Sequence, residues 1–201
     1  MRIGIYGGSF NPVHRGHKHL ADTMCAKLNL DKCIIMPAFV SPFKTDKKSS
    51  VTAQDRFRMC ELAFREANYE VSDLEIAKNE TSYTVNTLTA LKEQYPDDEL
   101  FLIIGSDMLL SFNRWYRWQD ILKLATLCAV SRCDEDPLQE LEDFAESHLR
   151  KEGEVLILPF SPLVVSSTLL REKIRIGEDT SAFLHPAVKD YIQQNNLYIE
   201  G

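Results

Sequence analysis

The chain has 201 residues, of which 44% are hydrophobic and 26% charged, a balance typical of a folded globular protein. Its formal net charge of −7 argues against a general nucleic-acid binder, because such proteins bind by neutralising many phosphates. No apolar run approaches the roughly 20 residues that span a bilayer, and glycines and histidines interrupt the N-terminus where a signal peptide would be apolar. We therefore expect a cytoplasmic protein with no nucleic-acid or membrane partner.

Strand-like runs alternate with helical patterns along the whole chain. The expected strands are residues 2–6, 33–37, 69–72, 100–104, 125–131 and 154–159. The expected helices are residues 17–28, 52–66, 85–95, 117–124, 137–151 and 167–176, followed by a closing helix within 186–198. This alternation predicts an α/β fold with a doubly wound, Rossmann-like parallel sheet, helices on both faces and a small C-terminal helical part. We expect one domain over residues 1–201.

Two stretches do not fit this regular pattern. Residues 38–50 are rich in Pro, Ser and Lys and predict a mobile loop. Residues 134–154 carry nine acidic side chains and predict a solvated peripheral helix, remote from any phosphate. The five cysteines form no C-x-x-C pair, which favours buried free thiols.

The segment Gly7–His17, which reads GGSFNPVHRGH, follows the first expected strand and leads into the first expected helix. Glycines allow close approach of the backbone to a ligand, and a helix N-terminus offers free N–H groups to a phosphate. The segment is neither a G-x-x-x-x-G-K-[ST] loop nor a G-x-G-x-x-G turn. Residues 1–21 also contain no Asp or Glu, which predicts a locally basic binding site for a small anion.

His14 and His17 stand at the expected helix start, where imidazoles add hydrogen-bond donors. From spacing alone, an incidental histidine cluster is the alternative. A metal site that included His19 is not expected, because no nearby Cys or acidic side chain completes a coordination shell. His19 itself is expected to lie on the surface.

Three further groups are candidates. Ser166, Ser167 and Thr168 could cap the helix that follows or donate to a phosphate, and Arg171 lies one turn on. Gly105 and Asp107 follow a buried strand, at the sheet edge where α/β proteins bind nucleotides, although Asp107 could equally cap a helix. The aromatic run Trp115, Tyr116 and Trp118 is typical of a core or an interface.

Two motifs carry a resemblance to a known family. GGSFNPVHRGH resembles the GG[ST]F[DN]P[IV]HxGH signature of the HxGH nucleotidyltransferase superfamily, and Val165–Arg171, VSSTLLR, resembles its ISSTxxR element. The whole chain is similar to the bacterial nicotinate-mononucleotide adenylyltransferases. Supporting matches are SYTVNTL from Ser82, IGSD from Ile104, WYRW from Trp115 and HPAVKDYI from His185. One departure is SPFK from Ser41, where the family commonly has PPHK, so that Phe43 replaces a histidine.

The resemblance implies transfer of an adenylyl group from ATP to nicotinate mononucleotide, in NAD biosynthesis, with Mg²⁺ accompanying ATP and no metal held by protein side chains. It implies that His14 and His17 are catalytic donors to the ATP phosphates. It places the acceptor near Tyr83, Thr84, Trp115 and Tyr116, with the carboxylate of the nicotinate at a helix start. The remaining ATP-binding residues it implies are Gly7, Gly8, Ser9, Phe10, Lys44, Gly105, Asp107, Ser166, Ser167, Thr168 and Arg171.

Two rival functions share the start of the chain. A phosphopantetheine adenylyltransferase has the HxGH motif but should lack the SYTVNTL and WYRW elements. A non-catalytic adenine-nucleotide sensor on the same fold would not need His14 or His17. The sequence leaves the oligomeric state open, and a homo-oligomer is one possibility.

Overall fold

The computed structural model describes residues 1–40, 51–132 and 138–199. Within them, one sheet of parallel strands runs in the order β3-β2-β1-β4-β5-β6. This order reverses between β1 and β4, as in the doubly wound dinucleotide-binding folds. The strands are β1 (Arg2–Gly8), β2 (Lys32–Pro37), β3 (Tyr69–Val71), β4 (Glu99–Gly105), β5 (Thr126–Arg132) and β6 (Val155–Phe160).

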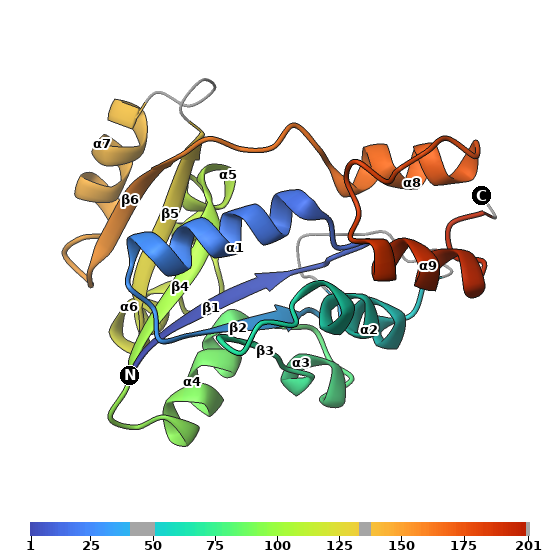
Figure 1. Ribbon diagram of the computed structural model, residues 1–201. Helices are drawn as coiled ribbons and strands as arrows, with labels where there is room; N and C mark the ends of the chain where they lie inside the picture. Colours follow the sequence, from blue (N-terminus) through green and yellow to red (C-terminus); the bar gives the residue numbers. More distant parts are fainter. Residues whose placement is uncertain (41–50, 133–137, 200–201) are drawn as a thin grey trace.

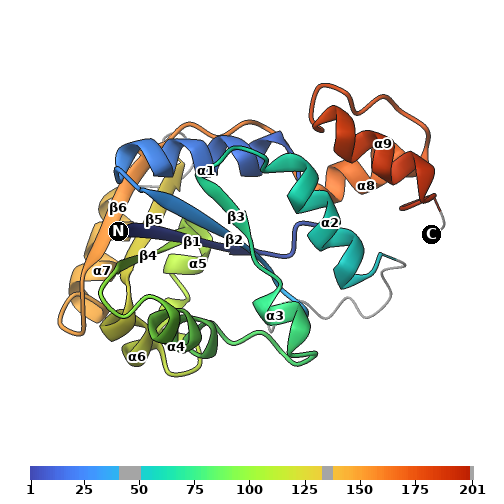
Figure 2. The same cartoon turned by 60° about the horizontal axis from the view of Figure 1, so that its bottom comes forward.

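Helices connect the strands and cover both faces of the sheet (Figures 1 and 2). They are α1 (Arg15–Lys27), α2 (Ala53–Ala63), α3 (Leu74–Ala77), α4 (Thr84–Gln94), α5 (Ser106–Leu109), the 3-10 helix η1 (Phe112–Arg114), α6 (Trp118–Leu124), α7 (Leu138–His148), α8 (Ser167–Arg175) and α9 (Pro186–Gln194). The small C-terminal part, α8 and α9, lies beyond the carboxyl ends of the strands, near the start of α1 (Figure 1). The predicted α/β fold is therefore confirmed.

Alternate side chains of each central strand enter two separate cores. Phe101 and Ile103 of β4 pack with α1, α2 and α9, whereas Leu100, Leu102 and Ile104 pack with α4, α6 and α7. Strand β4 is thus buried on both faces, as its unbroken apolar run predicts. The two cores fix the sheet between its helical layers and hold the carboxyl ends of β1 and β4 side by side.

Several predicted boundaries need correction at the first turn of the chain. Gly7 and Gly8 do not form a turn, because they pair with Met36 and Pro37 as the last residues of β1. The turn follows them, and Phe10 adopts the positive φ of 45°. Helix α1 begins at Arg15, two residues earlier than predicted. Helices α3, α5 and η1 were not predicted, since they span only three or four residues and show no periodicity.

The peripheral features agree with the sequence where the structure describes them. Cys33, Cys60 and Cys128 are buried free thiols, and Cys25 is partly buried, whereas Cys133 lies outside the described residues. Helix α7 packs at the edge of the sheet beside β6, far from α8 and α9 (Figure 1). Among the described residues, no helix has both the length and the apolar character needed to cross a membrane.

Candidate active site

The candidate site lies where the strand order reverses. Strands β1 and β4 are neighbours, and both end at the same edge of the sheet, with Gly8 and Gly105 as their last residues. The next helix on each side begins there, α1 after β1 and α5 after β4. Parallel α/β sheets bind ligands in the crevice at such a point. The topology therefore brings the loop Ser9–His14 and the Gly105–Asp107 element to one place.

The glycine at position 8 makes room for a side chain of the loop itself. A Cβ there would lie 3.0 Å from the ring of Phe10, which is buried and sits edge-on to the rings of Tyr6 and His17. At Gly7 the nearest atom to an added Cβ is 4.0 Å away. The packing of Phe10 thus explains Gly8, and it fixes the path of the backbone towards α1.

His14 and His17 form a reciprocal capping box at the start of α1. The Nδ1 atom of His14 accepts a hydrogen bond from the backbone N–H of His17 at 3.3 Å, and Nδ1 of His17 accepts from the N–H of His14 at 3.1 Å. Their rings stack with centroids 3.6 Å apart. Gly16 permits this geometry, because a Cβ there would lie 3.0 Å from Nδ1 of His14.

This arrangement determines what the two imidazoles can do. Since each Nδ1 accepts a backbone hydrogen bond, the proton of each neutral ring is on Nε2. His14 is only 8% exposed, and burial lowers its pKa from 6.5 to about 4. The positive end of α1 also disfavours a charged ring. His14 is therefore a neutral group whose Nε2–H can donate.

The C-terminal serine-threonine-arginine element contacts this loop directly. The Ser167 hydroxyl donates to the Pro12 carbonyl at 2.9 Å, and the Arg171 guanidinium donates to the Asn11 carbonyl at 2.9 Å. Ser166 is the N-cap of α8, and its hydroxyl accepts from Leu169. The N-cap role expected for a serine is thus present. Thr168 accepts from Arg171 at 3.2 Å.

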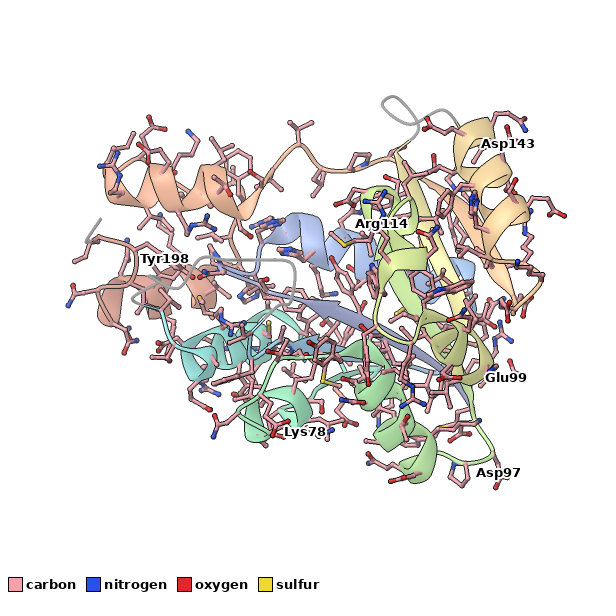
Figure 3. The ribbon with its side chains drawn as sticks, turned by 180° about the vertical axis from the view of Figure 1, so that it is seen from behind. Lys78, Asp97, Glu99, Arg114, Asp143 and Tyr198 are labelled. Atoms are coloured by element: carbon pink, nitrogen blue, oxygen red, sulfur yellow. The ribbon has the colours of Figure 1, made fainter. Side chains whose placement is uncertain are left out.

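Two interactions around this loop were not foreseen from the sequence. Tyr198, which follows α9, donates its phenol to Oδ1 of Asn11 at 2.6 Å (Figure 3). Arg56 of α2 is 7% exposed and donates to the Ser9 and Phe39 carbonyls. Thr52 and Asp55 form a capping box at the start of α2, and the fold turns Arg56 of this helix towards the loop.

Gly105 and Asp107 lie on the other side of the crevice. Gly105 is the N-cap of α5, and Asp107 is exposed in its first turn. A Cβ on Gly105 would lie 2.7 Å from Oδ1 of Asp107, so the glycine leaves space for that carboxylate. The sequence pair therefore acts as one structural unit at the end of β4.

A polar cleft of about 790 Å³ lies beside the crevice. Tyr83 and Tyr116 line it with their rings 5.0 Å apart, and Thr84 opens α4 next to them. Trp115, which precedes Tyr116 in sequence, packs on Phe112. The other lining residues are Phe39, Val40, Asn79, Glu80, Thr81 and Asn86. Of the predicted acceptor residues, Tyr83 and Tyr116 thus line one cleft, and Thr84 follows Tyr83 at the start of α4.

The prediction of a basic binding site formed by residues 1–21 needs correction. Arg2 pairs with Glu99 at the opposite end of the sheet from Tyr198 (Figure 3), because β1 begins there. Lys18 pairs with Asp22 and Glu66. Arg2 and Lys18 are thus paired with carboxylates, whereas Arg56 and Arg171 donate to carbonyls of the loop Ser9–His14.

Three other predictions concern this region. His19 is not plain surface, since its Nε2 lies 3.0 Å from the Ser161 carbonyl and its ring packs on Phe160. Lys44 and Phe43 lie outside the described residues, as does most of the predicted mobile loop. Within the described ranges, no three His, Cys, Asp or Glu side chains gather in a way that could hold a metal ion.

Comparison with known proteins extends over nearly the whole chain. The cytidylyltransferase-like family matches residues 5–173. A protein of Shewanella sp. (strain MR-4) and one of Carboxydothermus hydrogenoformans, both named "probable nicotinate-nucleotide adenylyltransferase", are 35% and 37% identical to the chain. Each alignment covers 98% of this chain, and 99% and 98% of the respective relative.

Solved structures show the same fold. The Plasmodium falciparum nicotinic acid mononucleotide adenylyltransferase complexed with NaAD superposes with a TM-score of 0.76 at 20% identity, over 98% of this chain and 97% of that one. The same protein complexed with APC gives a TM-score of 0.73 at 19% identity, over 98% and 96% of the two chains. The full-length sequence matches then decide the family. The chain belongs to the cytidylyltransferase-like family and, within it, to the nicotinate-nucleotide adenylyltransferases.

Proposed function

We propose that this protein transfers the adenylyl group of ATP to nicotinate mononucleotide, giving nicotinate adenine dinucleotide and pyrophosphate. The observation that carries the proposal is the meeting of two motifs about 150 residues apart, through the Ser167–Pro12 and Arg171–Asn11 hydrogen bonds. The names of the full-length relatives support the same activity. We also propose that residues 1–201 act as one nucleotidyltransferase domain; a homo-oligomer stays a prediction.

The reaction needs little covalent help from the protein. The acceptor phosphate is already an anionic nucleophile near neutral pH, so it attacks the α-phosphorus of ATP without a strong base. Holding the two anions in line contributes on the order of 7–11 kcal/mol. One well-aimed donor contributes about 2.7–4 kcal/mol. Positioning therefore outweighs any single side chain.

Each element of the crevice has a role in this scheme. His14 and His17 donate through Nε2–H to the phosphates as negative charge moves to the leaving pyrophosphate. Ser167, Thr168 and Arg171 hold the outer phosphates at the start of α8, where free N–H groups favour an anion. The other residues that we propose for ATP are Gly7, Gly8, Ser9, Phe10, Lys44, Gly105, Asp107 and Ser166.

The cleft beside the crevice suits the acceptor. Its two tyrosines, Tyr83 and Tyr116, and the neighbouring Trp115 offer aromatic surface for a pyridine ring. The N-terminus of α4, at Thr84, favours a carboxylate by about 0.3–1 kcal/mol and a neutral carboxamide less. We therefore propose nicotinate, and not nicotinamide, mononucleotide as the preferred acceptor.

Mg²⁺ fits this site as a companion of ATP. It is a hard cation that prefers phosphate and water oxygens, and it is commonly bound through the substrate. The imidazoles of the crevice are poor ligands for it, because their Nδ1 atoms already accept backbone hydrogen bonds. When bound, the ion would neutralise charge on the phosphates, while the residues named above position them.

The test is a pyrophosphate-release assay with ATP and one acceptor at a time. We expect turnover with nicotinate mononucleotide, about two- to fivefold lower kcat/KM with nicotinamide mononucleotide, and none with phosphopantetheine. Preference for phosphopantetheine would assign the rival reaction, and no turnover with ATP binding intact would indicate a nucleotide sensor. In the same assay, a His14→Ala variant with unchanged turnover would contradict the role of His14.

A further inference from the structure

Arg56 is a buried cation that the proposed reaction does not yet use. The residue is 7% exposed and extends from the first turn of α2, which the Thr52–Asp55 capping box holds in place. Nη1 donates to the Ser9 carbonyl at 2.8 Å, and Nη2 donates to the Phe39 carbonyl at 3.0 Å. Within the part of the chain that the structure describes, no carboxylate pairs with it.

The two carbonyls belong to different substrate sites. Ser9 is in the loop that leads to His14, whereas Phe39 lines the cleft of Tyr83 and Tyr116. The planar fork of a guanidinium can donate to both at once, which the point charge of a lysine cannot do in the same geometry. Arg56 thus directly connects the loop Ser9–His14, which we call the phosphate loop, to the cleft of Tyr83 and Tyr116, which we call the acceptor cleft.

Residues 38–40 make further hydrogen bonds, both to the end of β1 and to the segment that precedes α4. The N–H of Ala38 donates to the Gly8 carbonyl at 2.9 Å, at the end of β1. The N–H of Phe39 donates to Oγ of Ser82 at 3.1 Å, next to Tyr83. The N–H of Ser82 donates back to the Val40 carbonyl at 3.1 Å. A shift of either loop would therefore move the other.

From this geometry we propose that Arg56 is a positioning residue that couples binding of the two substrates, by tying the phosphate loop at Ser9 to the wall of the acceptor cleft at Phe39. The proposal rests on the proposed function, since it takes the crevice and the cleft as sites for ATP and for the acceptor mononucleotide. Its consequence is that each substrate binds more tightly when the other is present.

The experiment measures this coupling without turnover. The Kd of a non-hydrolysable ATP analogue is determined by calorimetry with and without saturating nicotinate mononucleotide, for the wild type, Arg56→Lys and Arg58→Lys. Arg58 is the matched control, because it lies two residues on in the same helix and is exposed in a surface pair with Glu61. We expect coupling of about fivefold or more in the wild type and in Arg58→Lys, and none in Arg56→Lys.

Steady-state kinetics then distinguish a positioning role of Arg56 from an effect on folding alone. Loss of one charge-assisted hydrogen bond should lower kcat/KM for both substrates about tenfold or more in Arg56→Lys, and should lower the melting temperature by several degrees while the variant stays folded at the assay temperature. Wild-type coupling in Arg56→Lys, or no coupling in the wild type, would overturn the proposal. The binding measurements stand even if the wild type shows no turnover, so failure of the proposed function is a separate result.

A second variant keeps the test decisive if Arg56→Lys does not fold. Ser82→Ala removes the hydrogen bond on the other side of Phe39 and leaves the guanidinium in place. We expect it to reduce the coupling at least about twofold, with unchanged secondary structure by circular dichroism. Full wild-type coupling in Ser82→Ala would contradict the bridge through Phe39.

Discussion

At the scale of single residues, the hydrogen bonds of the backbone set the chemistry of His14. Its Nδ1 atom caps α1, so only Nε2–H remains to face a substrate. Burial lowers its pKa to about 4, below the ordinary value of 6.5 that the unfolded chain has. As the pH falls, the unfolded chain therefore binds this proton first, and the folded state loses stability between about pH 6.5 and pH 4.

The first prediction concerns this loss of stability. From pH 7 to about pH 5, the shift to a pKa of about 4 should cost the wild type about 2 kcal/mol that His14→Asn does not lose, because asparagine retains the N-cap without titrating. Urea unfolding of both proteins at the two pH values measures the difference. An equal loss in both would show that His14 titrates normally.

Nitrogen NMR of the histidine rings checks the same prediction directly. We expect His14 to be neutral at pH 6 with its proton on Nε2. His148 is the internal control for a ring whose Nδ1 carries a hydrogen, because its Nδ1 lies 3.1 Å from the Phe144 carbonyl, which can only accept. A His14 ring protonated on Nδ1 at this pH would contradict the capping geometry.

Gly16 is the second residue whose role the structure defines. Gly16→Ala places a Cβ about 2.9 Å from Cγ1 of Val165 and 3.0 Å from Nδ1 of His14. We expect kcat to fall at least about tenfold, because the His14 donor is displaced, while α1 stays folded, since alanine favours a helix. Turnover assays and circular dichroism test this. In a Val165→Ala background the deficit should persist; complete recovery would assign it to Val165 instead.

At the scale of elements, the C-terminal helices hold the phosphate loop in place. The N–H of Arg15 donates to the Phe183 carbonyl at 2.8 Å, and Tyr191 of α9 donates to Asp55 of α2 at 2.9 Å. Together with Tyr198 on Asn11, these bonds join α9 and the residues on either side of it to the start of α1, to the loop before it and to α2. This part of the chain thus shapes the proposed ATP site from outside the sheet.

Tyr198→Phe tests this role of the C-terminal part. We expect the KM for ATP to rise about three- to tenfold, and the free energy of unfolding to fall by about 1 kcal/mol, because the hydroxyl bond to Asn11 is lost. Tyr95→Phe is the matched control, since the Tyr95 hydroxyl bonds to Lys32 near the opposite edge of the sheet. Kinetics and urea unfolding measure both. An equal rise in KM for the control would contradict the assignment.

At the scale of the whole molecule, strand order decides where the site forms. Strand β4 follows β1 in space although about 90 residues separate them in sequence, and the reversal there opens the crevice. Two cores, one on each face, hold these strands in register. A chain with a net charge of −7 can still offer the N-termini of several helices to its anionic substrates at this crevice.

The sequence by itself determined the alternation of strands and helices, the family motifs and the position of His14 and His17, because apolar periodicity and short motifs are local properties. It did not reveal Arg56, Tyr198 or the true partners of Arg2 and Lys18. Their roles depend on which backbone carbonyls and carboxylates lie beside them, and these come from distant segments. Only the tertiary structure decided those contacts, because packing across the sheet, and not local preference, brings such segments together.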